Sequence, residues 1–172
     1  LQNGYPYHVM EIDDRWQVYY GDLEFDPQRF PDPKAMIDEL HAKDFKVTTW
    51  VIPFLDERSN AFAEGTKNGW LVRHANGSPY LVPWWQGHGG LLDVTNPSAL
   101  EWFFERLSQL QVKTGCDGFK FDAGEACFLP DDAVTYQKIH PNEYTKIYVD
   151  AVAKHHRLTE VRSGWKNQTA PI

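Results

Sequence analysis

The feature that most constrains the fold is a repeated alternation of strand-like and helix-like segments along all 172 residues. The strand-like segments are short and rich in apolar, β-branched and aromatic residues, and the helix-like segments begin with capping residues followed by apolar side chains at helical spacing. Such an alternation predicts a parallel sheet crossed over by helices. Strands are expected over 7–13, 45–54, 116–124 and 158–165, and helices over about 32–43, over 96–110 and from 142 onward.

Polar residues gather where these strands end. Asp13 and Asp14 close the first strand, 56–58 follow the second, Asp122 closes the third and Arg162 lies in the fourth. In a (β/α)8 TIM barrel, the active site is built from the carboxyl ends of several strands. The sequence therefore predicts an α/β fold in which 1–172 form a partial barrel of about four βα units, with the remaining units outside this chain. A doubly wound sheet is the alternative.

The segment 55–95 is rich in Gly, Trp, Pro and His and is longer than an ordinary connection. It is interpreted as an insertion-like loop of the barrel that carries function or small elements of its own. Seven Trp residues and an aromatic content of 15% suit the binding of sugar rings. The formal net charge of −7 argues against nucleic acid or an anionic membrane surface as a partner. There is no run of apolar residues long enough to span a membrane.

The stretch DGFKFDAGE places a lysine and an aspartate two residues apart near the end of a buried strand. Residues two apart share one face of a strand, so Lys120 and Asp122 are expected to lie together as an ion pair. A neighbouring cation favours the charged form of a carboxylate, which suits a nucleophile better than a general acid. A purely structural ion pair is the alternative at this point.

Four segments in order resemble glycoside hydrolase family 31, whose members are α-glycosidases. TGCDGFKFDAGE resembles the family's nucleophile region, and its Lys-x-Asp form is closest to the α-xylosidase and α-galactosidase-like branches. The other three segments are HVMEID, WWQGHGGLLDVTNPSALEWF and EVRSGWKNQTAPI. The resemblance covers nearly the whole chain. It implies a TIM barrel and a retaining, exo-acting α-glycoside hydrolase of the α-galactosidase, α-xylosidase or α-glucosidase type that needs no cofactor and no metal.

The resemblance also implies individual roles. It makes Asp122 the nucleophile, Asp13 a ligand of sugar hydroxyls, Trp85 the sugar-facing tryptophan and Arg162 the arginine beside the nucleophile. The neighbour Asp14 and the residue Lys120 are assigned to substrate binding with them. Trp50 and Trp165 are added as sugar contacts because they lie at strand ends. Glu125 is expected to anchor its loop to Lys120 or Arg162.

Because of two departures from the family pattern, the resemblance does not identify the sugar of the substrate. Ala123-Gly124 stands where Met-Asn is common, and Gln86 stands where a proline follows the sugar-facing tryptophan. The family's acid/base aspartate is expected on the strand after the arginine strand, beyond Ile172, so this segment by itself is expected to be inactive. The alternative function is a catalytically silent relative that binds a glycan or a partner protein. The resemblance and the two Asn-x-Ser/Thr triplets at Asn76 and Asn167 favour the secretory pathway, the endoplasmic reticulum lumen or the lysosome.

Overall fold

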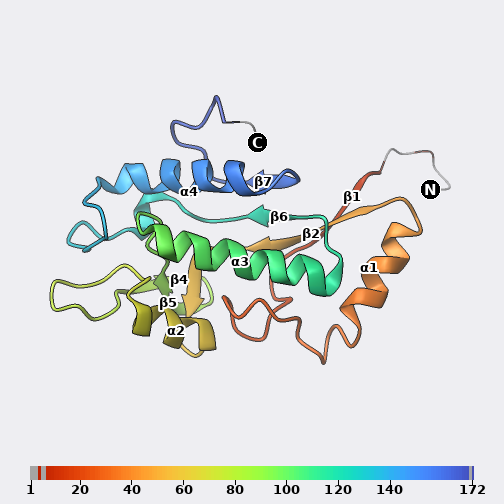
Figure 1. The fold of residues 1–172 in the computed structure, drawn as a ribbon, viewed down its shortest axis with the longest axis horizontal. Coiled ribbons are helices and arrows are strands. Elements are labelled where there is room, and N and C mark those ends of the chain that lie inside the picture. Colours follow the sequence, from red (N-terminus) through yellow and green to blue (C-terminus); the bar gives the residue numbers. More distant parts are fainter. Residues whose placement is uncertain (1–3, 5–6, 171) are drawn as a thin grey trace.

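The computed structural model describes residue 4, residues 7–170 and residue 172, and its centre is a four-stranded parallel sheet. The strand order is β1-β2-β6-β7, with every neighbouring pair parallel. In the view of Figure 1, α4 runs above β6 and α3 runs below it. The strands are β1 (Val9–Ile12), β2 (Lys46–Val51), β6 (Gly118–Phe121) and β7 (Thr159–Val161). The alternation in the sequence thus predicted the sheet and its four strands correctly.

The crossover helices form one continuous layer. Helix α1 (Pro33–His41) packs beside α3 (Pro97–Thr114), and a groove between α3 and α4 (Pro141–His155) shows that these two are also neighbours. A layer on one side of a parallel sheet is typical of a barrel, whereas a doubly wound sheet carries helices on both faces. Within the described residues, no helix has the length and apolar character needed to cross a membrane.

The helices begin where capping chemistry places them. Asp32 accepts a hydrogen bond from the backbone of Ala35 at the start of α1, and a proline follows each of the caps of α1, α3 and α4. The expected start of α4 at Asn142 is slightly wrong, because His140 is the N-cap. Its ring nitrogen accepts from the backbone of Asn142, and Glu143 accepts from the backbone of His140, which completes a capping box.

The segment expected to be one long loop contains a small sheet of its own. Strands β3 (Phe54–Asp56), β4 (Leu81–Trp84) and β5 (Gly87–Leu91) pair antiparallel in the order β3-β5-β4, and helix α2 (Asn60–Asn68) lies between β3 and β4. The expected strand over 45–54 is therefore divided, since β2 ends at Val51 and β3 belongs to the second sheet. Pro53 lies at the division, where its missing N–H interrupts strand pairing.

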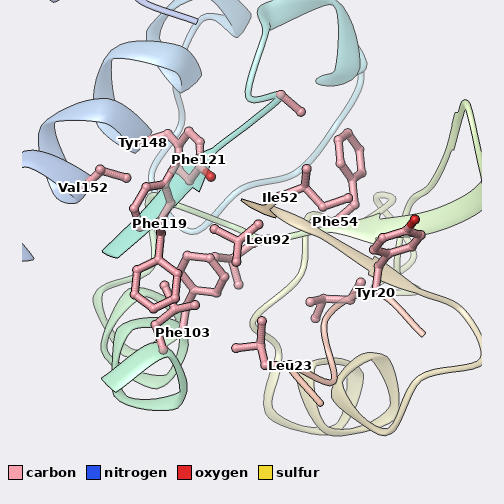
Figure 2. Packing of buried hydrophobic residues seen from close by; sticks show 14 of the residues in the cluster. Tyr20, Leu23, Ile52, Phe54, Leu92, Phe103, Phe119, Phe121, Tyr148 and Val152 are labelled. Atoms are coloured by element: carbon pink, nitrogen blue, oxygen red, sulfur yellow. The ribbon is translucent and has the colours of Figure 1, made fainter. Parts of the chain in front are cut away.

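The core lies between the parallel sheet and the helices. Phe119 and Phe121 are fully buried, and Figure 2 shows Phe121 beside Tyr148 of α4, with their ring centroids 6.2 Å apart. Because strand side chains alternate, the intervening Lys120 and the following Asp122 face the opposite side of the sheet. The same alternation that builds the core therefore sends the charged residues of β6 to the inner side of the barrel.

His156 follows α4 within this core and predicts a pH-dependent stability. Its ring lies 5.0 Å from that of Phe119 and 5.5 Å from that of Phe121, and burial, followed by the charge of His155, lowers its pKa to about 4. The unfolded state binds the proton near pH 6.5, so the folded state loses stability as the pH falls from about 6.5 to 4.

We expect acidification from pH 7 to 4.5 to lower the free energy of unfolding of the parent by about 1 kcal/mol more than that of His156→Phe. The expected difference is small because the imidazole is only partly buried. Thermal unfolding of both proteins across this range measures the difference. The exposed His8→Gln is the matched control and should follow the parent. Equal pH dependence in His156→Phe and the parent would show that His156 titrates normally.

Candidate active site

The carboxylate of Asp122 is the centre of the site. It follows β6 directly and is 7% exposed. The guanidinium of Arg162, directly after β7, forms an ion pair through Nε with Asp122 Oδ1 at 2.8 Å. The indole Nε1 of Trp50, on β2, donates a hydrogen bond of 2.9 Å to Asp122 Oδ2. Each oxygen thus has one fixed partner, supplied by a neighbouring strand.

Arg162 has a second carboxylate partner. Its Nη2 lies 2.8 Å from Oε1 of Glu125, which follows Asp122 by three residues. Of the two anchors expected for Glu125, the structure selects Arg162. The guanidinium therefore bridges the two carboxylates and keeps Glu125 on the same side as Asp122.

The expected ion pair between Lys120 and Asp122 is not formed. Lys120 Nζ lies 2.9 Å from Oε1 of Glu11 and 3.5 Å from Oδ2 of Asp13. Its long side chain reaches across β2 to β1, because the neighbouring strands carry acceptors and Asp122 is already held by Arg162. The hydrogen bond to Glu11 raises the pKa of Lys120, and burial raises the pKa of Glu11 against the opposing effect of the lysine.

Trp85 lies beside this group at the tip of the β4–β5 hairpin. Its ring is 46% exposed and stands edge-on to that of Trp50, with centroids 6.2 Å apart. The guanidinium carbon of Arg162 lies 5.8 Å from the centre of the Trp85 ring. Trp85 is therefore a partly exposed aromatic side chain beside Trp50 and Arg162, the two residues that hold Asp122.

The carboxylate of Asp14 is hydrogen-bonded to the β4–β5 hairpin and is not free in solvent. Its Oδ1 accepts a short hydrogen bond from the hydroxyl of Tyr20, and its Oδ2 accepts from Nε2 of Gln86 at 3.4 Å. The Oε1 of Gln86 in turn accepts from Nη2 of Arg15 at 3.3 Å. The loop after β1 is thereby tied to the residue next to Trp85.

The sequence-predicted residues separate into four groups, one of which is Asp14 with its partners Tyr20 and Gln86. Asp122, Arg162, Trp50 and Trp85 contact one another in the chain of neighbours given above, and Lys120 and Asp13 form an adjoining pair. Trp165 lies in the exposed segment after Arg162, and within the described part of the chain it has no aromatic or hydrogen-bonding contact with the others. Sequence reasoning missed Glu11, although its place two residues before Asp13 on β1 put it on the same face. It also gave no structural role to Tyr20 or Gln86.

No group of three or more His, Cys, Asp or Glu side chains suited to a metal ion occurs among the residues that the structure describes. The arrangement is instead a carboxylate with two fixed hydrogen-bonding or cationic partners beside an aromatic platform. Such a group can attack an electrophilic carbon while a ring substrate is held against the indole.

The chain matches the family model "Glycosyl hydrolases family 31 TIM-barrel domain" over residues 1–169. The chain belongs to glycoside hydrolase family 31. The four-stranded sheet is accordingly part of that family's TIM barrel, and it is open because only four of the barrel strands are present here.

The family 31 relatives include the myogenesis-regulating glycosidase of Mus musculus, which is 40% identical over 161 residues, covering 92% of this chain and 22% of the relative. Alpha-xylosidase XylQ of Lactiplantibacillus pentosus is 34% identical, covering 86% of the chain and 20% of the relative. The second relative belongs to the α-xylosidases, one of the two branches that the Lys-x-Asp stretch indicated. The chain spans about a fifth of the length of these curated relatives.

Solved structures agree on the fold. A family 31 sulfoquinovosidase from E. rectale, in complex with an aza-sugar inhibitor, superimposes with a TM-score of 0.73 at 27% identity, covering 92% of this chain and 26% of that one. A dextranase from Flavobacterium johnsoniae, complexed with glucose, has a TM-score of 0.77 at 20% identity, covering 91% and 22%. The second match supports the fold alone.

The contact between Gln86 and Asp14 predicts an effect on substrate affinity. We expect Gln86→Leu in the whole protein to raise KM for an α-glycoside about fivefold with little change in kcat, because loss of two hydrogen bonds loosens the Trp85 hairpin without touching Asp122. Steady-state kinetics and acrylamide quenching of tryptophan fluorescence measure both effects. Gln109→Leu, the same substitution at an exposed position on α3, is the control. An unchanged KM in Gln86→Leu would show that the hairpin holds its position without this contact.

Proposed function

We propose that the whole protein hydrolyses α-glycosides with retention of configuration and that Asp122 is its nucleophile. The observation that carries the proposal is the geometry of Asp122, a buried carboxylate at the end of a barrel strand whose two oxygens face Arg162 and Trp50. Membership in family 31 supports the same reaction class. A carboxylate held in one orientation is preorganised to attack an anomeric carbon.

The proposed reaction has two steps. A carboxylate oxygen of Asp122 attacks the anomeric carbon as the bond to the aglycone oxygen breaks, which gives a covalent glycosyl-enzyme, and water then releases the sugar. The aglycone needs a proton from a second carboxyl group on the other side of the bond. Glu125 is held by Arg162 on the side of the nucleophile, so we assign the acid to another part of the whole protein.

The proposed sugar contacts follow the positions of the side chains. Trp85 offers its exposed ring to the apolar face of the sugar, and Trp165 lies in the segment that follows Arg162. Asp13, with the ammonium of Lys120 at 3.5 Å, offers an oxygen to sugar hydroxyls at the end of β1. Asp14 acts through Gln86 on the hairpin in this proposal, because both of its oxygens already accept hydrogen bonds.

We propose an exo-acting enzyme whose sugar is an α-galactoside, an α-xyloside or an α-glucoside. The relatives named above include an α-xylosidase and the myogenesis-regulating glycosidase, and the Lys-x-Asp stretch points to the same branches. Treatment of the whole protein with 5-fluoro-α-galactosyl fluoride and its xylo and gluco counterparts, followed by intact mass measurement and peptide mapping, tests the proposal.

A glycosyl adduct on Asp122 with one of the three probes is the expected result. An adduct on another carboxylate would overturn the assignment of the nucleophile. If no probe labels the protein while glycans still bind, the protein is a silent family member that acts by binding.

We also propose that the protein enters the secretory pathway, where only one of the two Asn-x-Ser/Thr triplets is accessible. Asn76 lies exposed in a turn, whereas Asn167 is buried and its Nδ2 donates to Asp150 at 2.8 Å. We expect glycopeptide mapping of the protein from its native source to find a glycan on Asn76 and none on Asn167. An unmodified Asn76 or a modified Asn167 would contradict this prediction.

A further inference from the structure

A recess lined by three arginines adjoins the sugar site. It has a volume of about 240 Å³ and lies between the loop after β1, the end of β3 and the tip of the β4–β5 hairpin. This volume is near the lower end of ligand pockets, which begin at about 300 Å³, so the recess has room for one small group and not for an oligosaccharide. Its lining residues include Arg15, Tyr20, Arg29, Asp56, Arg58 and Gln86.

The guanidinium groups are held in place by neighbours. Arg58 donates from Nε and Nη2 to the two oxygens of Asp56 at 2.9 and 2.7 Å. Arg29 lies 3.4 Å from a carboxylate oxygen of Asp26 and donates to the backbone oxygen of Arg15. The lining itself carries three positive groups and one negative group, Asp56, and Asp26 beside Arg29 adds a second negative charge. Guanidinium groups with remaining N–H donors suit the planar or tetrahedral oxygens of an anion.

The recess shares two residues with the surroundings of Asp122. Gln86 lines it and adjoins Trp85 in sequence, and Tyr20 lines it while its ring stands edge-on to that of Trp50, with centroids 5.4 Å apart. The recess therefore begins at the residue next to Trp85, so a ligand that extends from Trp85 past Gln86 would reach it.

We propose that this recess is a subsite for an anionic substituent of the glycoside substrate, a carboxylate, sulfate or phosphate carried next to the sugar that is cleaved. The inference rests on the proposed function, since it takes the sugar site to be occupied at the same time. Arg15 and Arg58 supply the charge, and Gln86 separates the anion from the ring on Trp85. The structural alternative is that the arginines serve only their partners Asp26 and Asp56.

Binding of uncleavable thioglycosides to the whole protein tests the inference. The ligands are phenyl 1-thio-α-galactosides, xylosides and glucosides that carry either a carboxylate or the neutral carboxamide at the 3- or 4-position of the phenyl ring. Calorimetric titration is run at low and high NaCl concentration on the parent, Arg15→Gln, Arg58→Gln and the control Lys43→Gln. The control removes one positive charge at an exposed position after α1.

We expect the carboxylate ligand to bind about tenfold more tightly than its carboxamide at low salt, and the preference to shrink at 0.5 M NaCl to about twofold. Each arginine variant should lose most of the preference, and Lys43→Gln should keep it. If the carboxamide binds and no preference exists, or if the preference survives in both arginine variants, the anionic subsite is refuted while the sugar site stands. If neither ligand of any sugar binds, the proposed function fails and the subsite fails with it.

Discussion

Replacing Asp122 by asparagine is expected to lower kcat of the whole protein toward an aryl α-glycoside by about 10⁴-fold or more, because the amide cannot form the covalent glycosyl ester. The substitution keeps the size of the side chain and leaves an oxygen for either Arg162 or Trp50. Folding should therefore be preserved, which circular dichroism and thermal unfolding check. Initial rates with a substrate that has a good leaving group measure the loss.

Glu125→Gln is the matched control for this experiment. Glu125 touches the same guanidinium, 2.8 Å from its Nη2, but is not assigned to attack the sugar. Its loss should reduce kcat by about tenfold or less, since it removes one partner of Arg162 and leaves the pair with Asp122. A loss in Glu125→Gln as large as that in Asp122→Asn would mean that Glu125 also takes part in the chemical step, against its assignment as a partner of Arg162.

Chemical rescue decides the role of Asp122 by stereochemistry. Asp122→Gly leaves room for azide, whose nitrogen attacks the anomeric carbon as the aryl oxygen departs with the bonding electrons. If Asp122 is the nucleophile of a retaining enzyme, this single displacement inverts the centre and gives the β-glycosyl azide. An α-glycosyl azide would instead arise from an intact nucleophile elsewhere and would assign Asp122 to the acid/base role.

The positions of the candidate site residues were predictable because they depend on the fold more than on contacts. Asp13, Asp122 and Arg162 each follow a parallel strand directly, and the carboxyl ends of parallel strands meet at one edge of a barrel. The alternation of apolar residues on β6 predicted its buried face. Both inferences use periodicity and strand direction alone, which a sequence displays.

The partners of individual side chains were harder to predict. Lys120 was paired with Asp122 because the two share a face of one strand, but residues two apart on a strand are separated by about 6.6 Å along it. Acceptors on neighbouring strands can lie as near as that, and Lys120 pairs with Glu11 on β1 and with Asp13, which directly follows β1. Such a choice depends on strand order, which places β2 between the lysine and its partners.

The second, antiparallel sheet was also hard to predict from the sequence. The apolar run 45–54 looks like one strand, yet Pro53 ends the pairing with β1 and β6, and the chain enters an antiparallel sheet at Phe54. Trp85 lies in the turn between β4 and β5, which pair antiparallel, and β5 also pairs with β3. The motif around Trp85 predicted a sugar-facing tryptophan, which stays a prediction, whereas the contact of the neighbouring Gln86 with Asp14 required the structure.

Gly118→Ala is expected to cause the largest loss of stability among single substitutions near the site. A Cβ at this position would lie 2.0 Å from the backbone oxygen of Leu158 and 2.8 Å from its Cβ. The same backbone oxygen accepts the N–H of Phe119 at 3.1 Å, which begins the pairing of β6 with β7. Because the clash is with backbone atoms, only a shift of β7 relieves it. We expect the free energy of unfolding to fall by about 3 kcal/mol.

That shift connects the glycine to catalysis. Arg162 directly follows β7, so a displaced β7 moves the guanidinium away from Asp122 and from the face of Trp85. Hydrogen-exchange mass spectrometry of the whole protein should show faster exchange in peptides that cover 118–121 and 159–161, with a parallel loss of kcat. Gly164→Ala is the control, because a Cβ there meets no heavy atom within 4 Å. If Gly118→Ala retains the protection and the activity of Gly164→Ala, the close approach of β6 and β7 does not set the position of Arg162.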